Sequence, residues 1–280
     1  MATTKTDSDA VKNFLDCAVD FCIIQSLLNR YKMNFRTFFA NAVCGTIPGK
    51  KRRDIVRIKI KYREYLRDCK RFALEHTDGE KHKVRIDVGA RSHNLILLVG
   101  NVAAFKFPLH ENGYDKATRE KRIVDAFTKI SPIKIPKLEV IQWGDITVRK
   151  YEFAQGVLLK KIKPSIVIKN RDKIASQLAK FMVAIGNSDP VSIRDLKPNK
   201  NEKPRFLHGW FHNDIAENFT VDPKTLDILY FIDWEDTIFY DFELGLMHAR
   251  NSWEKSGFVG LTDALIDKYT KLYKKSGKQD

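Results

Sequence analysis

The sequence predicts an α+β protein in which a helical extension precedes two lobes. Three observations support this fold class. Apolar residues recur at three- and four-residue steps before residue 80, short apolar runs separated by turns follow, and helical periodicity returns in the second half. We therefore expect a basic helical extension at 1–80, a first lobe at 81–153 and a second lobe at 154–280. The 280 residues, 43% of them hydrophobic, suffice for a core in each lobe.

The extension contains two helical patterns, separated at 45–51 by "GTIPGKK", because Gly and Pro interrupt helices. Residues 50–72 hold eleven Lys/Arg against three Asp/Glu, an excess of eight within a net charge of +15. This basic face is either solvated or a docking surface for an anionic partner. The apolar positions of the two patterns are Val11, Phe14, Leu15, Ala18 and Cys22, then Ile55, Ile58, Tyr62, Tyr65, Leu66, Cys69, Phe72 and Ala73.

The first lobe reads as an antiparallel sheet with one helix. Strand patterns at 84–88, 94–99 and 102–107 are separated by polar or Gly-containing turns. A helix is expected at 117–127. A hairpin follows, formed by "LEVIQW" and "ITVRKYEF" with its turn at Gly144 and Asp145. The order is three strands, a helix and two strands.

The second lobe is expected to be mainly helical. The segment "RDKIASQLAKFMVAIGN" places Ile174, Leu178, Phe181, Met182 and Ile185 on one face. Short strands then surround a group of carboxylates, and "LTDALIDKYTKLYKK" predicts a last helix.

Composition excludes several classes of protein. No run of about 18 uncharged apolar residues predicts a membrane span, and the first residues lack the apolar core of a secretory signal, so we expect a cytoplasmic protein. The four cysteines, at positions unlike CxxC and without a His cluster, argue for reduced structural thiols instead of a zinc site.

Polar residues gather in two neighbouring stretches of the second lobe. "FHNDIAENFTVD" contains His212, Asp214 and Asn218, and "YFIDWED" delivers Asp233 at the end of an apolar run. A carboxylate beside an attacking hydroxyl and hard oxygen ligands for a divalent cation are what phosphoryl transfer requires. From the residues alone, an Asx-rich turn is the structural alternative for the first stretch.

These motifs resemble the protein-kinase-like superfamily, in particular its aminoglycoside phosphotransferase and choline kinase branch, over about residues 83–275. The resemblance implies that Asp214, with His212, forms the catalytic loop and that Asn218 and Asp233 bind Mg²⁺. Asn218 follows Asp214 by four residues, one fewer than in the family pattern, so Glu217 is an alternative ligand. The "IDWE" sequence is similar to that of small-molecule kinases and unlike the DFG of protein kinases.

The resemblance also implies a set of ATP-binding residues in the first lobe. Lys106, in "AAFKFP", would contact the phosphates and pair with a carboxylate, for which Glu120 is favoured over Glu111. Two further groups complete the expected site: Gly89 and Ser92 in the loop that covers the nucleotide, and the backbone of Tyr151, Glu152 and Phe153 at the adenine edge.

The function that follows is an ATP- and Mg²⁺-dependent phosphotransferase acting on a hydroxyl group. The acceptor is either a small molecule or sugar, or a protein Ser/Thr side chain. Asp233 to Asp241 leaves no room for a long activation segment, so regulation by phosphorylation there is not expected. Two alternatives remain from other classes: an inactive pseudokinase that binds partners, and a nucleic-acid-binding protein using the basic helix.

Overall fold

The computed structural model describes residues 48–77, 82–88, 94–109 and 113–276. The chain divides into two compact units, Met1–Phe72 and Ala73–Asp280. The finer boundaries expected at residues 80 and 153 stay predictions. The first helical pattern, at 11–22, lies outside the described residues.

The basic segment forms two helices, α4 (Lys50–Lys61) and α5 (Arg63–Glu75), instead of one continuous helix. Apolar spacing continues through Tyr62 without Gly or Pro, so the pattern could not reveal this break. On α5, Leu66, Cys69 and Phe72 are buried, and Cys69 forms no disulfide. Arg57, Lys59 and Lys61 on α4 are exposed. Recognition of an anionic partner by this face stays a prediction.

The first lobe is a five-stranded antiparallel sheet with the strand order β1-β2-β3-β5-β4. Alternate residues of β2 are buried, as expected for a strand with one face on a core. The register of β3 and β5 places Lys106 directly opposite Arg149. The elements of this lobe are β1 (Val84–Val88), β2 (Asn94–Val99), β3 (Ala103–Pro108), α6 (Tyr114–Phe127), β4 (Leu138–Trp143) and β5 (Ile146–Glu152).

The second lobe combines helices with two small sheets. One sheet pairs β7 with β10, and the other has the order β6-β8-β9. Its elements are β6 (Val157–Leu158), η1 (Leu159–Lys161), α7 (Pro164–Lys169), α8 (Arg171–Gly186), η2 (Val191–Leu196), β7 (His208–His212), β8 (Phe219–Val221), β9 (Ile228–Phe231), η3 (Trp234–Asp236), β10 (Thr237–Asp241), α9 (Glu243–Lys255) and α10 (Leu261–Lys275).

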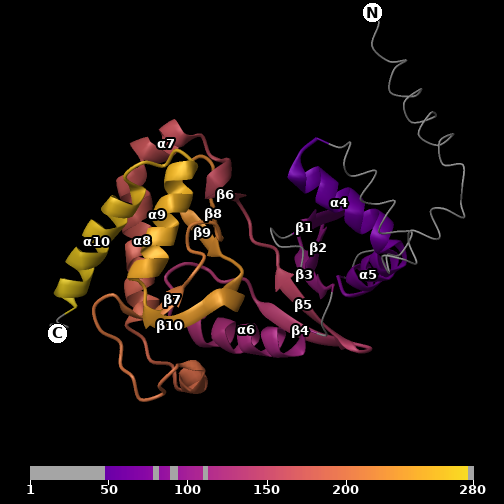
Figure 1. The fold of residues 1–280 in the computed structure, drawn as a ribbon, viewed down its shortest axis with the longest axis horizontal. Coiled ribbons are helices and arrows are strands. Elements are labelled where there is room, and N and C mark those ends of the chain that lie inside the picture. Colours follow the sequence, from indigo (N-terminus) through magenta and orange to yellow (C-terminus); the bar gives the residue numbers. More distant parts are fainter. Residues whose placement is uncertain (1–47, 78–81, 89–93, 110–112, 277–280) are drawn as a thin grey trace, which may run out of the picture. The chain divides into compact units, whose positions relative to one another are not determined.

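Aromatic side chains fill the core beneath the carboxylate loops. Helix α8 packs along α10, as Figure 1 shows, and contributes Phe181, whose ring stacks on Phe231 with centroids 3.9 Å apart. Trp234 packs on Phe127 and Phe181, so the turn that follows β9 rests on both α6 and α8. Large buried rings restrict motion because protein cores are close-packed. The core therefore supports the loops directly.

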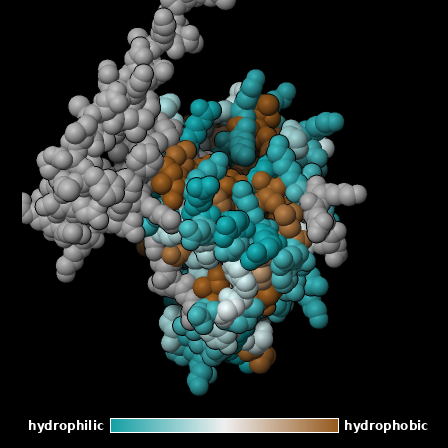
Figure 2. Space-filling model, turned by 90° about the vertical axis from the view of Figure 1, so that its right-hand side faces the viewer, coloured by the Kyte–Doolittle hydropathy of each residue, from teal (hydrophilic) through white to brown (hydrophobic). Residues whose placement is uncertain are grey.

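Large exposed hydrophobic side chains are spread over several elements, and Figure 2 shows apolar groups interrupted by hydrophilic residues on one face of the molecule. Such dispersed side chains are normal for a protein surface. Among the helices that the structure describes, none is both long and apolar enough to span a membrane.

Candidate active site

Two loops that bear carboxylates meet in the second lobe. The turn after β7 carries Asp214 and Asn218, and β8 and β9 form the hairpin that leads to Asp233. The Ile232 N–H donates to the Asn218 carbonyl at 2.8 Å, which joins the two loops by their backbones. The structure thus brings together the two motifs singled out in the sequence.

His212 lies behind these loops and is fully buried. Its Nε2 is 2.9 Å from the Ile232 carbonyl oxygen, and a carbonyl only accepts, so Nε2 carries the proton. Burial lowers the pKa of His212 despite this carbonyl and the nearby carboxylates, which favours the neutral ring. The catalytic role expected for His212 stays a prediction, and burial limits it to holding the peptide before Asp233.

Asp214 is exposed at the loop surface, next to the side chain of Tyr240. The Tyr240 hydroxyl donates to Asn213 Oδ1 at 2.8 Å. Burial and then the Asp214 charge raise the pKa of Tyr240 to about 12. Asp214 therefore has an open carboxylate on a loop that Tyr240 anchors.

Asn218 and Glu217 have different surroundings. Glu217 is exposed and forms an ion pair with Lys160 at 2.9 Å. Asn218 is partly buried, and its carbonyl holds Ile232. The backbone link to the Asp233 strand favours Asn218 over Glu217 as the second oxygen ligand.

Asp233 has a left-handed backbone conformation, with φ 63° and ψ 66°. Few residues other than Gly adopt this region, and Asp is among those that tolerate it. Its Oδ1 lies 2.5 Å from Lys106 Nζ. Burial alone would raise the pKa of Asp233, but the Lys106 ammonium outweighs it and lowers that pKa, so the carboxylate is ionised.

Lys106 is the more buried partner of this pair, with 10% of its side chain exposed against 36% for Asp233. Its Nζ lies 5.4 Å from the centre of the Tyr151 ring. Burial opposes the charged form, yet the carboxylates of Glu120, Asp233 and Glu235 together raise the pKa of Lys106. Lys106 is a fixed cation at the sheet face, as the sequence predicted.

The expected ion pair between Lys106 and Glu120 is wrong, because Lys106 pairs with Asp233. Glu120, on α6, is fully buried and accepts hydrogen bonds from Arg149 Nη1 at 2.8 Å and the Tyr151 hydroxyl at 2.7 Å. Its other oxygen accepts the Trp234 N–H at 3.0 Å. A strand arginine thus replaces the lysine as the partner of the helix carboxylate.

The hinge also differs in detail from the expectation. The N–H groups of Glu152 and Phe153 donate to the carbonyls of Lys137 and Val102, so neither is available to an adenine edge in this structure. The next N–H, that of Ala154, donates to no backbone carbonyl in the described ranges. Gly89, Ser92 and the competitor Glu111 lie outside the described residues.

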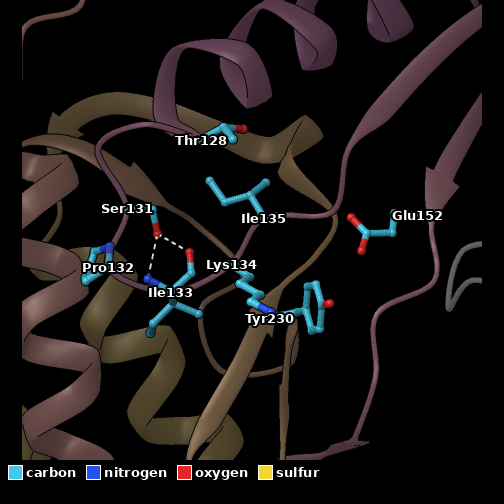
Figure 3. A pocket seen from close by; sticks show the side chains of 8 residues that line it. All are labelled: Thr128, Ser131, Pro132, Ile133, Lys134, Ile135, Glu152 and Tyr230. Carbon is cyan, nitrogen blue, oxygen red and sulfur yellow. Dashed lines mark hydrogen bonds between the residues drawn. The ribbon is translucent and has the colours of Figure 1, made fainter.

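The Glu152 side chain faces a pocket behind the hinge, shown in Figure 3. Burial and then the Glu152 carboxylate raise the pKa of Tyr230, which lines the same pocket. This pocket, of about 230 Å³, does not include Lys106, Asp214 or Asp233. Its lining residues are Thr128, Ser131, Pro132, Ile133, Lys134, Ile135, Glu152 and Tyr230.

Sequence reasoning missed Arg149 and Glu235, which form a close ion pair beside Lys106. Counting the register across the hairpin could have placed Arg149 on the same sheet face as Lys106. Glu235 carried no comparable signal, because its contact depends on how the lobes pack.

The oxygen donors of the two loops suit a hard cation. No group of three or more His, Cys, Asp or Glu residues in the described part of the chain forms a metal cage of its own. Mg²⁺ commonly binds through one or two protein ligands plus phosphate oxygens and water. A carboxylate on Asp233 and an amide oxygen on Asn218 fit that requirement.

Comparison with known proteins adds information about the fold. No protein-family model matches the sequence, and no curated protein matches it. Among solved structures, the streptomycin–ATP ternary complex of APH(2")-IIa has a TM-score of 0.52 at 14% identity, covering 69% of this chain and 79% of that chain.

Two further solved structures give the same picture. A type VIII aminoglycoside-3'-phosphotransferase has a TM-score of 0.51 at 15% identity, covering 70% of this chain and 88% of that chain. A GDP complex of an aminoglycoside 2'-phosphotransferase of type IIIa has a TM-score of 0.50 at 18% identity, covering 70% and 83%. The predicted fold class is thereby confirmed: the chain has the α+β fold of the aminoglycoside phosphotransferases within the protein-kinase-like superfamily.

Proposed function

We propose that this protein is an ATP-dependent phosphotransferase that transfers the γ-phosphoryl group to a hydroxyl of a small molecule. The observation that carries the proposal is the ion pair of Lys106 with Asp233, at 2.5 Å, on a loop joined by its backbone to the one bearing Asp214. A buried cation, a metal-binding carboxylate and an open carboxylate are the parts this reaction needs.

Each residue has a separate role in the proposed reaction. Lys106 leaves Asp233 and contacts the ATP phosphates, while Asp233 and Asn218 hold Mg²⁺. The bound Mg²⁺ supplies positive charge that balances the phosphate oxygens. Positioning and charge neutralisation provide most of the catalysis in this chemistry.

Asp214 orients the acceptor hydroxyl and takes its proton. The acceptor oxygen forms a bond to the γ-phosphorus, the bond from that phosphorus to the β–γ bridging oxygen breaks, and ADP leaves. His212 donates to the Ile232 carbonyl and so fixes the peptide before Asp233. Ala154, beyond the two N–H groups already used in the sheet, offers the hinge N–H to the nucleotide base.

A small-molecule acceptor is supported by the solved structures that share the fold, one of which contains streptomycin and ATP. The alternative predicted from the sequence, a protein Ser/Thr acceptor, becomes an outcome of the same assay. Nucleotide choice is part of the assay as well, since the structures with this fold include complexes with ATP and with GDP.

The test is transfer of label from [γ-³²P]ATP or GTP in Mg²⁺ to panels of aminoglycosides, sugars, choline and proteins. We expect a labelled small molecule that the Asp214→Asn variant does not produce. Label on protein alone would support the other acceptor class. ATP binding without transfer to any acceptor would indicate a pseudokinase, and failure to bind either nucleotide would overturn the proposal.

A further inference from the structure

Arg149 is a buried arginine whose side chain lies between three polar partners. Only 3% of it is exposed. Its Nη1 donates to Glu120 Oε2 at 2.8 Å and also contacts Glu235 Oε2, and its Nη2 donates to Asn94 Oδ1 at 3.1 Å. Arginine suits such a position because its planar group serves several acceptors at once and stays charged.

The same region ties α6 to the segment that follows Asp233. Arg119 donates to the Glu235 carbonyl at 2.5 Å and to the Thr237 carbonyl, and Glu120 accepts the Trp234 N–H. The helix therefore holds the backbone of η3 through two adjacent residues. The position of η3 does not depend on Lys106.

The charges around Lys106 do not balance. Lys106 and Arg149 are cations, whereas Glu120, Asp233 and Glu235 are carboxylates that all act on Lys106. Arg149 engages two of them directly, Glu120 and Glu235. Lys106 is left with Asp233, the most exposed of the three carboxylates.

We propose that Arg149 is a positioning residue that keeps Glu120 and Glu235 off Lys106, so that Lys106 can exchange Asp233 for the phosphates of a nucleotide. This inference rests on the proposed function for the identity of the phosphate ligand. Without Arg149, the two buried carboxylates have Lys106 as their nearest cation, and ATP must compete with them. Lys106 then stays bound within the protein.

The first test compares Arg149→Met with the double variant Arg149→Met/Glu235→Gln. We expect the KM for ATP of the single variant to rise by about tenfold or more, with a smaller change in kcat. The double variant, which removes one competing carboxylate, should recover to within about threefold of the wild type. A purely structural role predicts no recovery, because the space left by Arg149 persists in both variants.

Two further variants keep the test decisive if Arg149→Met does not fold. Glu235→Gln alone should leave ATP affinity unchanged or tighter, and a loss of about tenfold would overturn the proposal. Arg122→Met is the matched control, because Arg122 pairs with Asp195 at an exposed position on α6. It should behave as the wild type.

A second readout does not require catalysis or ATP. Labelling of Lys106 by an amine-reactive reagent, measured by mass spectrometry without nucleotide, should slow by about threefold or more in Arg149→Met, because unpaired carboxylates hold the ammonium form. Labelling should recover in the double variant. Absence of recovery in both assays overturns the inference, whereas normal labelling behaviour in a protein that binds no nucleotide would overturn only the proposed function.

Discussion

Replacing Glu120 with alanine should destabilise the second compact unit far more than other changes on the same helix. The carboxylate is fully buried and accepts three hydrogen bonds, from Arg149, Tyr151 and Trp234. Alanine leaves all three donors without this acceptor. Arg149 keeps Glu235 and Asn94, but the other two lose the acceptor that orders them.

The size of the effect follows from these contacts. A buried donor left unsatisfied costs about 1–3 kcal/mol, and more when charged. Taking about 1 kcal/mol each for the Tyr151 hydroxyl and the Trp234 N–H, and about 2 kcal/mol for Arg149, gives roughly 4 kcal/mol. Glu120→Gln keeps an oxygen for Trp234 and should cost about half as much.

Urea unfolding followed by fluorescence measures this loss, and thermal unfolding checks it. For a unit of this size, 4 kcal/mol corresponds to a Tm lower by roughly 8–16 °C. The matched control is Asp125→Ala, which breaks an exposed ion pair with Lys121 on α6 and should cost no more than about 0.5 kcal/mol. A Glu120→Ala variant within about 1 kcal/mol of the wild type would refute the reasoning, because the three donors would then have other acceptors or water.

Three further predictions concern the candidate active site. Asp214→Asn should abolish phosphoryl transfer and leave ATP affinity, measured by calorimetry, within about twofold, because the residue faces the acceptor; normal turnover would contradict its assignment. Asp233→Asn should weaken ATP binding in Mg²⁺ by about tenfold or more but not in EDTA, and equal affinities in Mg²⁺ would exclude it as a ligand. Asn218→Ala should raise the Mg²⁺ concentration for half-maximal transfer by about tenfold, whereas Glu217→Ala, which breaks only the pair with Lys160, should not. The reverse pattern would assign the metal to Glu217.

Local sequence patterns predicted most of the sheet because strands and tight turns are local features. The expected strands at 84–88 and 94–99 match β1 and β2, and the hairpin turn lies between β4 and β5 at the predicted Gly144. Helix α6 begins at Tyr114, three residues before the expected start. Helix α9 was not predicted, since its apolar residues follow no long periodic stripe.

Side-chain partners across elements were much harder to predict than the elements. Lys106 was placed correctly on its strand, but its partner depended on whether Asp233 or Glu120 lies closer in the folded lobe. Spacing along the chain carries no information about that choice. The same holds for Arg149, whose role depends on a carboxylate 86 residues away.

The backbone at Asp233 links the fold to the proposed chemistry. A left-handed conformation in a residue other than Gly costs about 1–3 kcal/mol and persists only where neighbouring contacts enforce it. Ile232, on one side, is held by His212 and by Asn218. Trp234, on the other side, is held by Glu120 and by its indole N–H, which donates to the Phe231 carbonyl.

These contacts fix the peptides on both sides of Asp233 while its own carboxylate remains partly exposed and paired only with Lys106 among the ion pairs of the described residues. The arrangement separates two requirements that conflict in a single side chain. Buried neighbours supply the rigidity that a catalytic geometry needs, and the carboxylate keeps the freedom to exchange a lysine for a metal ion. A site built in this way can tolerate low sequence similarity to other kinases, because its geometry depends on a few buried anchors and not on the surface residues around them.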